Sequence, residues 1–191
     1  MKILVIGGDG RRHTIVWKCA QSPHVTQIWC APGNAGISME QLIRNGQFVE
    51  CVSIDAKNLS ELLAFALENR PDLTIVGPDD PLALGIVDLF QKHGLRIWGP
   101  NRKAARFEWS KAFAQRFMEK YEIPCPYGQV FTESSTAKDF ARSLGWQCVV
   151  KADGLALGKG AFPCMNEVGV NSAIEQMLVH KNLGPAGEVI V

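Results

Sequence analysis

Long hydrophobic runs and strong net charge are both missing from this sequence. The apolar stretch at the amino terminus reaches Gly7 after a few residues, which is too short for the apolar region of a signal peptide or for a membrane span. The formal net charge is +1 with both signs interspersed, so no general electrostatic field favours nucleic acid or an anionic membrane. We therefore expect neither partner, and any anion site must be local.

Paired cysteine motifs are also missing. The six cysteines are scattered without a Cys-x-x-Cys pair, and several lie inside apolar runs, where a small buried thiol fits. This distribution predicts no zinc site, and it predicts a cytoplasmic protein that keeps its thiols reduced.

What is present is typical of a folded globular protein. Hydrophobic residues make up 47% and charged residues 20% of the 191 residues, and this length suits one large or two modest domains. In the first half, short apolar runs alternate with segments of helical spacing. The expected strands are 3–6, 25–31, 72–76 and 95–98, and the expected helices are 11–21, 59–67 and 81–90. Such alternation predicts βαβ units and an α/β, doubly wound parallel sheet.

The pattern changes after residue 106. A helical segment at 110–121 is followed by Pro124 and Pro126, which cannot continue a helix. We place a domain boundary there, giving a first domain of residues 1–122 with a linker helix and a second of residues 123–191. The second should be a small α+β unit with one strand that leads into Lys151, further strands near 129–131, 162–164 and 188–191, and helices at 136–143 and 167–180. Because the sequence stops on an apolar run, we expect a longer natural protein.

A glycine-rich loop follows one expected strand of the second domain. The strand delivers Lys151 to its end, and the next residues include Gly154, Gly158, Lys159 and Gly160. Glycines let backbone N–H groups approach an anion, and lysines place charges on its oxygens. The spacing differs from a Walker motif, so another class of nucleotide-binding loop is indicated. The alternative is a glycine-containing hairpin with two solvated lysines.

The first strand ends in another candidate anion site. Gly7, Gly8, Asp9, Gly10 and Arg11 form a tight turn that opens onto a helix amino terminus, where backbone N–H groups lack partners. Because Asp9 stands where a Gly-x-Gly-x-x-Gly fingerprint that begins at Gly7 has its second glycine, a dinucleotide is disfavoured and a single phosphate held by backbone and Arg11 is favoured. A purely structural turn is the alternative, and His13 alone would more often be a packing residue.

Two further loops follow expected strands, at residues 31–36 and 77–81. Carboxyl ends of parallel strands meet at one edge of a sheet, so we expect all three loops to converge. Either loop taken alone would be an ordinary turn. Asp79 either accepts hydrogen bonds from sugar hydroxyls or caps the helix that begins near Pro81.

Ordered blocks along the whole chain carry a family resemblance. They comprise residues 7–13, 31–36, 76–82, 99–100, 108–113 and 151–160. Together they resemble the glycinamide ribonucleotide synthetase family of the ATP-grasp superfamily. The resemblance implies a Rossmann-like, pre-ATP-grasp domain that binds a ribose phosphate, followed by a small lid subdomain of the ATP-grasp fold.

The resemblance also implies ligands and site residues. In this family ATP phosphorylates the glycine carboxylate, and 5-phosphoribosylamine then attacks the acyl phosphate. We expect ATP with Mg²⁺, or Mn²⁺ in its place, glycine and 5-phosphoribosylamine as ligands, a monomer, and metal ligands beyond Val191. The expected ATP-binding residues are Lys111, Lys151, Asp153, Gly154, Gly158, Lys159 and Gly160. The expected ribose-phosphate residues are Gly8, Gly10, Arg11, His13, Gly33, Asn34, Pro78 and Asp79.

The chain departs from the family pattern near the first turn. Asp9 stands where the family usually has glycine and Arg12 where it has glutamate, and Asp79 replaces the more usual glutamate. A carboxylate beside a phosphate repels it unless Arg12 offsets the charge. Two alternatives therefore stay open: an ATP-grasp ligase for another small acid and amine, and a non-catalytic module that binds a nucleotide or ribose phosphate.

Overall fold

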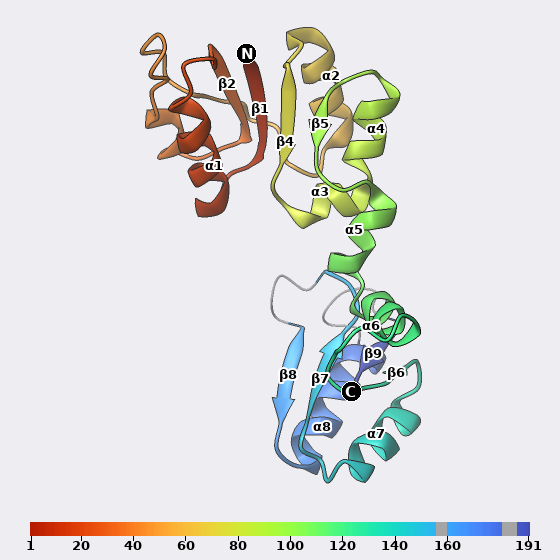
Figure 1. The fold of residues 1–191 in the computed structure, drawn as a ribbon. Coiled ribbons are helices and arrows are strands. Elements are labelled where there is room, and N and C mark those ends of the chain that lie inside the picture. Colours follow the sequence, from red (N-terminus) through yellow and green to blue (C-terminus); the bar gives the residue numbers. More distant parts are fainter. Residues whose placement is uncertain (156–159, 181–186) are drawn as a thin grey trace. The chain divides into compact units, whose positions relative to one another are not determined.

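The chain folds into two compact units, Met1–Ala105 and Arg106–Val191. The computed structural model describes residues 1–155, 160–180 and 187–191 (Figure 1). Each unit has its own sheet and its own hydrophobic core.

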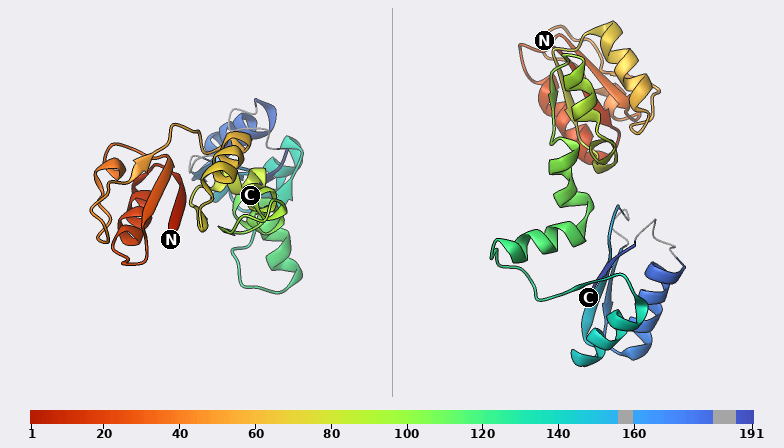
Figure 2. Two further views of the ribbon diagram at one scale, coloured as in Figure 1. Left: turned by 90° about the horizontal axis from the view of Figure 1, so that it is seen from above. Right: turned by 90° about the vertical axis from the view of Figure 1, so that its right-hand side faces the viewer.

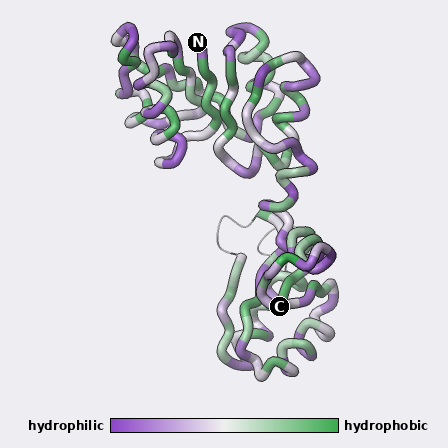
Figure 3. The backbone as a smooth tube through the Cα atoms, in the orientation of Figure 1, coloured by the Kyte–Doolittle hydropathy of each residue, from purple (hydrophilic) through white to green (hydrophobic). Residues whose placement is uncertain are grey.

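The first unit is built on a five-stranded parallel sheet with the order β3-β2-β1-β4-β5. Its strands pair in parallel throughout, which confirms the predicted doubly wound architecture. The strands are β1 (Lys2–Gly7), β2 (Gln27–Pro32), β3 (Glu50–Cys51), β4 (Leu73–Val76) and β5 (Ile97–Trp98). Hydrophobic residues follow the central strands β1 and β4 (Figure 3), and β1 is buried on both faces from Ile3 onward, as expected for a central strand of a parallel sheet.

Helices cover both faces of this sheet. The helical elements are α1 (Gly10–Ala20), the 3₁₀ turn η1 (Ile37–Met39), α2 (Leu59–Asn69), α3 (Asp79–Leu84) and α4 (Ile86–Lys92). Helix α5 (Arg102–Trp109) begins in this unit and ends in the second. On one face Ile3 and Val5 of β1 share a core cluster with Val16 of α1. On the other face the Trp29 ring of β2 meets the Phe65 ring of α2 edge to face, with 5.7 Å between centroids.

The prediction of one continuous helix over residues 81–90 is wrong. Residues 81–90 were expected to be a single helix, but Gly85 takes a left-handed conformation with φ of +94° and divides the segment into α3 and α4. Glycine adopts this conformation without the steric cost that other residues meet. The short strand β3 and helix α5 were not predicted.

The second unit is a four-stranded antiparallel sheet with the order β6-β9-β7-β8. Its helices α7 and α8 lie side by side on one face of the sheet (Figure 2), and residues such as Val150, Ala152 and Ile174 form the core between them. The strands are β6 (Val130–Phe131), β7 (Cys148–Ala152), β8 (Ala161–Cys164) and β9 (Val189–Ile190). The helices are α6 (Lys111–Lys120), α7 (Ser134–Ser143), α8 (Glu167–Ile174) and the π-helical turn η2 (Glu175–Val179). A small α+β unit was predicted here, and it is confirmed.

The compact units and the sequence-based domains divide the chain at different places. The structure groups residues 106–122 with the antiparallel sheet, whereas the sequence grouped them with the first domain because two prolines follow. The division into domains 1–122 and 123–191 stays a prediction.

Candidate ligand-binding loops and nucleotide site

The loops after β1, β2 and β4 lie at the carboxyl edge of the parallel sheet. The chain runs outward from β1 to β2 and β3 and then returns to β4 on the other side of β1. The switch point of the sheet therefore lies between β1 and β4. Open α/β sheets bind ligands outside the carboxyl ends of their strands at such a point.

The first two loops touch each other through backbone. The Gly33 N–H donates to the Gly7 carbonyl at 3.2 Å, and the side-chain amide of Asn34 donates to the Gly8 carbonyl at 2.6 Å. A Cβ atom at Gly8 would lie 2.3 Å from the Gly33 carbonyl oxygen, so only glycine permits this approach. The structure thus brings together Gly8, Gly33 and Asn34, as the sequence predicted.

His13 faces the second loop. Its Nε2 lies 2.8 Å from Glu40 Oε1, and a Cβ atom at Gly36 would lie 3.0 Å from its Cε1. These contacts fix the ring against the loop that follows β2. They agree with His13 being a packing residue, and contact of His13 with a ligand stays a prediction.

Asp9 and Arg12 form an ion pair at the start of α1. Asp9 Oδ1 accepts from the Arg12 backbone N–H at 3.2 Å and thereby caps the helix, and Oδ2 lies 2.7 Å from Arg12 Nη1. Burial raises the pKa of the Asp9 carboxyl, but the hydrogen bonds from Arg12 and the charges of Arg12 and Arg11 outweigh it and leave the pKa below its ordinary value. Arg12 therefore offsets the charge of Asp9, which would otherwise repel a phosphate bound beside it.

The Arg12 side chain lies at the switch point. Only 7% of it is exposed, and Cβ atoms placed at Gly7 and Gly77 would lie 2.7 Å and 2.3 Å from its Cγ and Nε. Arg11, the arginine that the sequence analysis favoured, is exposed to solvent, as is Gly10. Sequence reasoning did not single out Arg12, because its burial depends on Gly7 at the end of β1 and on Gly77 after β4, which are far apart in the sequence.

The third loop contributes Pro78 and Asp79. Pro78 occupies the position before α3, and Asp79 is the first helical residue. No side chain caps this helix, and Asp79 is exposed. The structure therefore does not show the capping role that was one of two interpretations of Asp79.

The second candidate site lies where β7 meets the amino terminus of α6. Asp153 Oδ1 accepts from the Ala112 backbone N–H at 2.9 Å, and Oδ2 accepts from the Ser110 hydroxyl at 3.1 Å. The Ser110 hydroxyl in turn accepts from the Phe113 N–H at 3.1 Å. Both oxygens of Asp153 thus anchor the start of the glycine-rich loop to α6, and direct contact of Asp153 with a nucleotide stays a prediction.

Lysines flank the same loop. Lys111 Nζ donates to the Gly154 carbonyl at 3.2 Å, so the first residue of α6 contacts the loop predicted to cover phosphate. Lys151 is half-buried and alternates along β7 with Val150 and Ala152 of the core, so it projects from the opposite face of the strand. The Ala152 N–H donates to the Gly160 carbonyl at 2.8 Å and closes the base of the loop. Gly158 and Lys159 lie outside the described residues.

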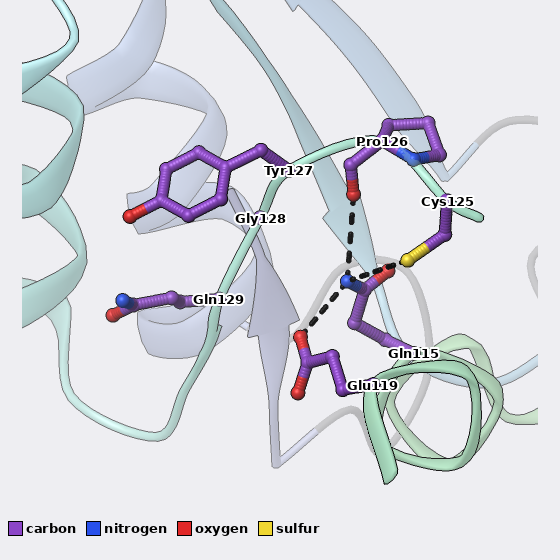
Figure 4. A pocket seen from close by; sticks show the side chains of 7 residues that line it. All are labelled: Gln115, Glu119, Cys125, Pro126, Tyr127, Gly128 and Gln129. Carbon is purple, nitrogen blue, oxygen red and sulfur yellow. Dashed lines mark hydrogen bonds between the residues drawn. The ribbon is translucent and has the colours of Figure 1, made fainter. Parts of the chain in front are cut away.

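A further pocket lies between α6 and the segment before β6 (Figure 4). Its volume is about 560 Å³, and it is lined by Gln115, Glu119, Cys125, Pro126, Tyr127, Gly128 and Gln129. The Gln115 amide holds it together by donating to Glu119 Oε1 at 2.9 Å and to the Pro126 carbonyl at 3.5 Å. No local pattern in the sequence indicates this pocket, and its lining has no cationic side chain for phosphate.

Metal ligands do not gather within the described part of the chain. Residues 1–155, 160–180 and 187–191 contain no group of three or more His, Cys, Asp or Glu side chains that could hold an ion. In the same residues no helix has the length and apolarity needed to cross a membrane.

Comparison with known proteins assigns both units. The family model described as phosphoribosylglycinamide synthetase, N domain, matches residues 1–108, and the one described as phosphoribosylglycinamide synthetase, ATP-grasp (A) domain, matches residues 109–191. The chain belongs to the phosphoribosylglycinamide synthetase family. Membership agrees with the resemblance carried by the sequence blocks and with the parallel and antiparallel sheets of the two units.

Individual family members agree along the entire chain. It is 44% identical over 191 residues to the phosphoribosylamine–glycine ligase of Caldanaerobacter subterraneus subsp. tengcongensis and 44% identical to that of Escherichia coli. All of this chain matches 44% and 43% of those proteins, so it spans less than half the length of these curated relatives.

Solved structures support the fold. The phosphoribosylamine–glycine ligase of Thermotoga maritima superposes with a TM-score of 0.72 at 23% identity, covering 100% of this chain and 43% of that one. A biotin carboxylase domain from Hydrogenobacter thermophilus, described in complex with MgADP and bicarbonate, gives a TM-score of 0.73 at 19% identity and covers 99% of this chain and 43% of that one. The fold is therefore shared with a protein from outside the family.

Proposed function

We propose that this chain is the amino-terminal part of a phosphoribosylamine–glycine ligase, the ATP-dependent enzyme that joins glycine to 5-phosphoribosylamine in purine biosynthesis. The observation that carries the proposal is 44% identity to such ligases over all 191 residues. We also propose a cytoplasmic location, because all six cysteines remain free thiols, as suits a reducing compartment.

In this proposal the first unit binds the ribose phosphate. The convergent loops at Gly8, Gly33 and Asn34 support it, because they place backbone and amide groups at the carboxyl edge of the sheet. The exposed carboxylate of Asp79 would accept hydrogen bonds from sugar hydroxyls. Backbone N–H groups at the start of α1 would face the phosphate.

The second unit binds the nucleotide. Lys111 and Lys151 would neutralise its phosphates, and the loop that begins at Asp153 and Gly154 would cover them. The contact between Lys111 and the Gly154 carbonyl supports this assignment, since it holds one cation beside the loop. The described residues offer no cluster of side chains that would hold Mg²⁺.

The chemistry needs charge neutralisation more than a protein nucleophile. A glycine carboxylate oxygen attacks the γ-phosphorus of ATP, and ADP leaves with the electrons of the broken P–O bond. The amine of phosphoribosylamine then attacks the acyl carbon, and inorganic phosphate leaves as the amide forms and the amine loses a proton. Residues of this chain would position the phosphates, stabilise their charge and exclude water from the acyl phosphate.

An ADP-release assay on the full natural protein tests this function. Incubation with ATP, Mg²⁺, glycine and 5-phosphoribosylamine should release ADP only when both substrates are present. Lys111→Gln and Lys151→Gln should each weaken ATP binding by about 10- to 100-fold, the loss expected for a charged hydrogen bond. Lys138→Gln removes a surface lysine paired with Glu175 and serves as the matched control. Absence of ADP release with a folded protein would refute the ligase assignment.

A second candidate function rests on the ion pair beside the first turn. Asp9 and Arg12 stand where the family usually has glycine and glutamate, and they contact each other at 2.7 Å. This change in charge favours an ATP-grasp ligase that takes another small acid or amine. A substrate panel in the same ADP assay separates the two candidates.

A further inference from the structure

Arg12 differs from the other cations of the first unit in its burial and position. Its residue is 6% exposed, and its stem crosses the glycines that end β1 and follow β4. Most arginines stay at the surface because desolvating a guanidinium is costly unless it is paired and hydrogen-bonded. A buried arginine at a switch point therefore calls for a partner on every donor.

The guanidinium of Arg12 is only partly hydrogen-bonded in the structure. Nη1 donates to Asp9 Oδ2 at 2.7 Å, but the buried Nε has no hydrogen-bond partner among the described residues. Buried polar atoms of this kind are rare and costly. The guanidinium thus holds one carboxylate and keeps capacity for another acceptor.

The carboxylate that it holds is itself open to solvent. The Asp9 side chain is 59% exposed, whereas the Arg12 side chain is 7% exposed. Asp9 therefore lies on the solvent side of the pair, where an incoming anion would meet it first. A phosphate offers more acceptor oxygens than this one carboxylate and matches the forked donors of arginine.

We infer that Arg12 is the anion-binding side chain of the first unit, and that Asp9 occupies its guanidinium until the phosphate of the ligand displaces the carboxylate. The inference rests on the proposed function in that the phosphate is taken to be that of a ribose phosphate. Asp9 then competes with the ligand for the guanidinium, and Arg12 binds the ligand's phosphate.

The two partners of the pair should have opposite effects on binding. An ion pair that is only structural would weaken binding when either partner is lost. A competing carboxylate should instead strengthen binding when it is neutralised, because it repels the phosphate and holds its donor. Asp9→Asn is a clean variant, since asparagine caps helices as well as aspartate does and retains an acceptor for the Arg12 N–H.

The experiment is calorimetric titration of the whole chain with ribose 5-phosphate. Arg12→Gln should weaken binding by about 10- to 100-fold, and Asp9→Asn should strengthen it by about 3- to 10-fold. Arg11→Gln should weaken it less than Arg12→Gln, and Arg96→Gln, an exposed arginine of the same unit, should leave it unchanged. Circular dichroism confirms that each variant is folded.

The binding results test the roles of Arg12 and Asp9 separately from the ligase activity. Weaker binding by Asp9→Asn, or a larger loss from Arg11→Gln than from Arg12→Gln, overturns the inference and leaves the proposed function standing. Binding of inorganic phosphate that depends on Arg12, without binding of ribose 5-phosphate, supports the inference and refutes the proposed substrate. Binding of neither probe overturns the inference. If Arg12→Gln does not fold, the direction of the Asp9→Asn effect decides.

Discussion

Asp153 shows how a single side chain shapes the proposed nucleotide site. Its two oxygens accept from the Ala112 N–H and the Ser110 hydroxyl, so it joins the end of β7 to the start of α6. Asp153→Ala should lower the free energy of unfolding by about 1–3 kcal/mol, the cost of losing a charged helix cap. Urea denaturation measures the change.

The control for this variant is Asp139→Ala. Asp139 also pairs with a cation, Arg142 Nη1 at 2.9 Å, but both side chains are more than 60% exposed, and such pairs contribute about 0–1 kcal/mol. Equal losses from the two variants would contradict an anchoring role for Asp153.

Because of Cys30, the free energy of unfolding should decrease at alkaline pH. Burial, then the charge of Cys51, raises the pKa of the Cys30 thiol to about 12, and the thiol donates to the Gly7 carbonyl at 3.1 Å. In the unfolded chain the pKa is about 8.5. The unfolded state therefore loses its proton first, and stability should fall as pH rises from about 8.5 toward 12, by about 2 kcal/mol at pH 10.

Denaturation of the wild type and of Cys30→Ser across pH 8–11 measures this dependence. Serine keeps a donor for the Gly7 carbonyl but does not ionise in this range, so the variant should lose the alkaline component that Cys30 causes. An identical slope in both proteins would show that other groups are responsible.

Residue chemistry was only partly readable from the sequence. Gly154 could be named because its loop has a distinctive order of residues, and Lys111 could be named through the family resemblance; the structure joins them. Arg12 could not be named as a site residue, because its burial depends on both Gly7 at the end of β1 and Gly77 after β4. A tertiary contact of that kind leaves no local pattern.

At the scale of elements, close approach of two loops sets the shape of the proposed ribose-phosphate site. A Cβ atom at Gly8 would lie 2.3 Å from the Gly33 carbonyl oxygen, whereas one at Gly10 would have nothing within 4 Å. Gly8→Ala should therefore destabilise the protein by about 1–3 kcal/mol, because backbone must move. Gly10→Ala, at the start of α1, should stabilise it by about 0.4–1 kcal/mol through the unfolded state.

Thermal or urea denaturation of the two variants gives the comparison, with ribose 5-phosphate titration alongside. Gly8→Ala should also weaken ligand binding, since it separates the loops after β1 and β2. Destabilisation of similar size at both positions would contradict the spacing argument.

Elements with strong periodicity were predictable, and those set by tertiary context were not. The strands β1 and β4 and the helices α1 and α2 follow apolar patterns that match their periods. The two-residue β3 exists because it pairs with Trp29 and Cys30 of β2, and the break between α3 and α4 depends on the conformation of Gly85. Neither feature has a pattern long enough to detect.

At the scale of the molecule, each unit has its own sheet and its own candidate ligand. Alternation of strands and helices predicted the parallel sheet of the first unit, and the switch point then follows from its strand order. The antiparallel order of the second unit brings Lys151 opposite Ile190 and Ala161, a pairing that the sequence did not specify.

Separate ligands should protect separate units from hydrogen exchange. A ligand that binds only the native state slows local opening where it binds, in proportion to its saturation. Ribose 5-phosphate should slow exchange of backbone amides in residues 8–13 and 33–36, whereas ATP should slow it in residues 110–113 and 151–155. Mass spectrometry of peptides from the whole chain maps both effects, with ribose and adenosine as controls that lack phosphate. Protection of the same peptides by both ligands would contradict the assignment of one ligand to each unit, because the candidate residues for the two ligands lie on different sheets.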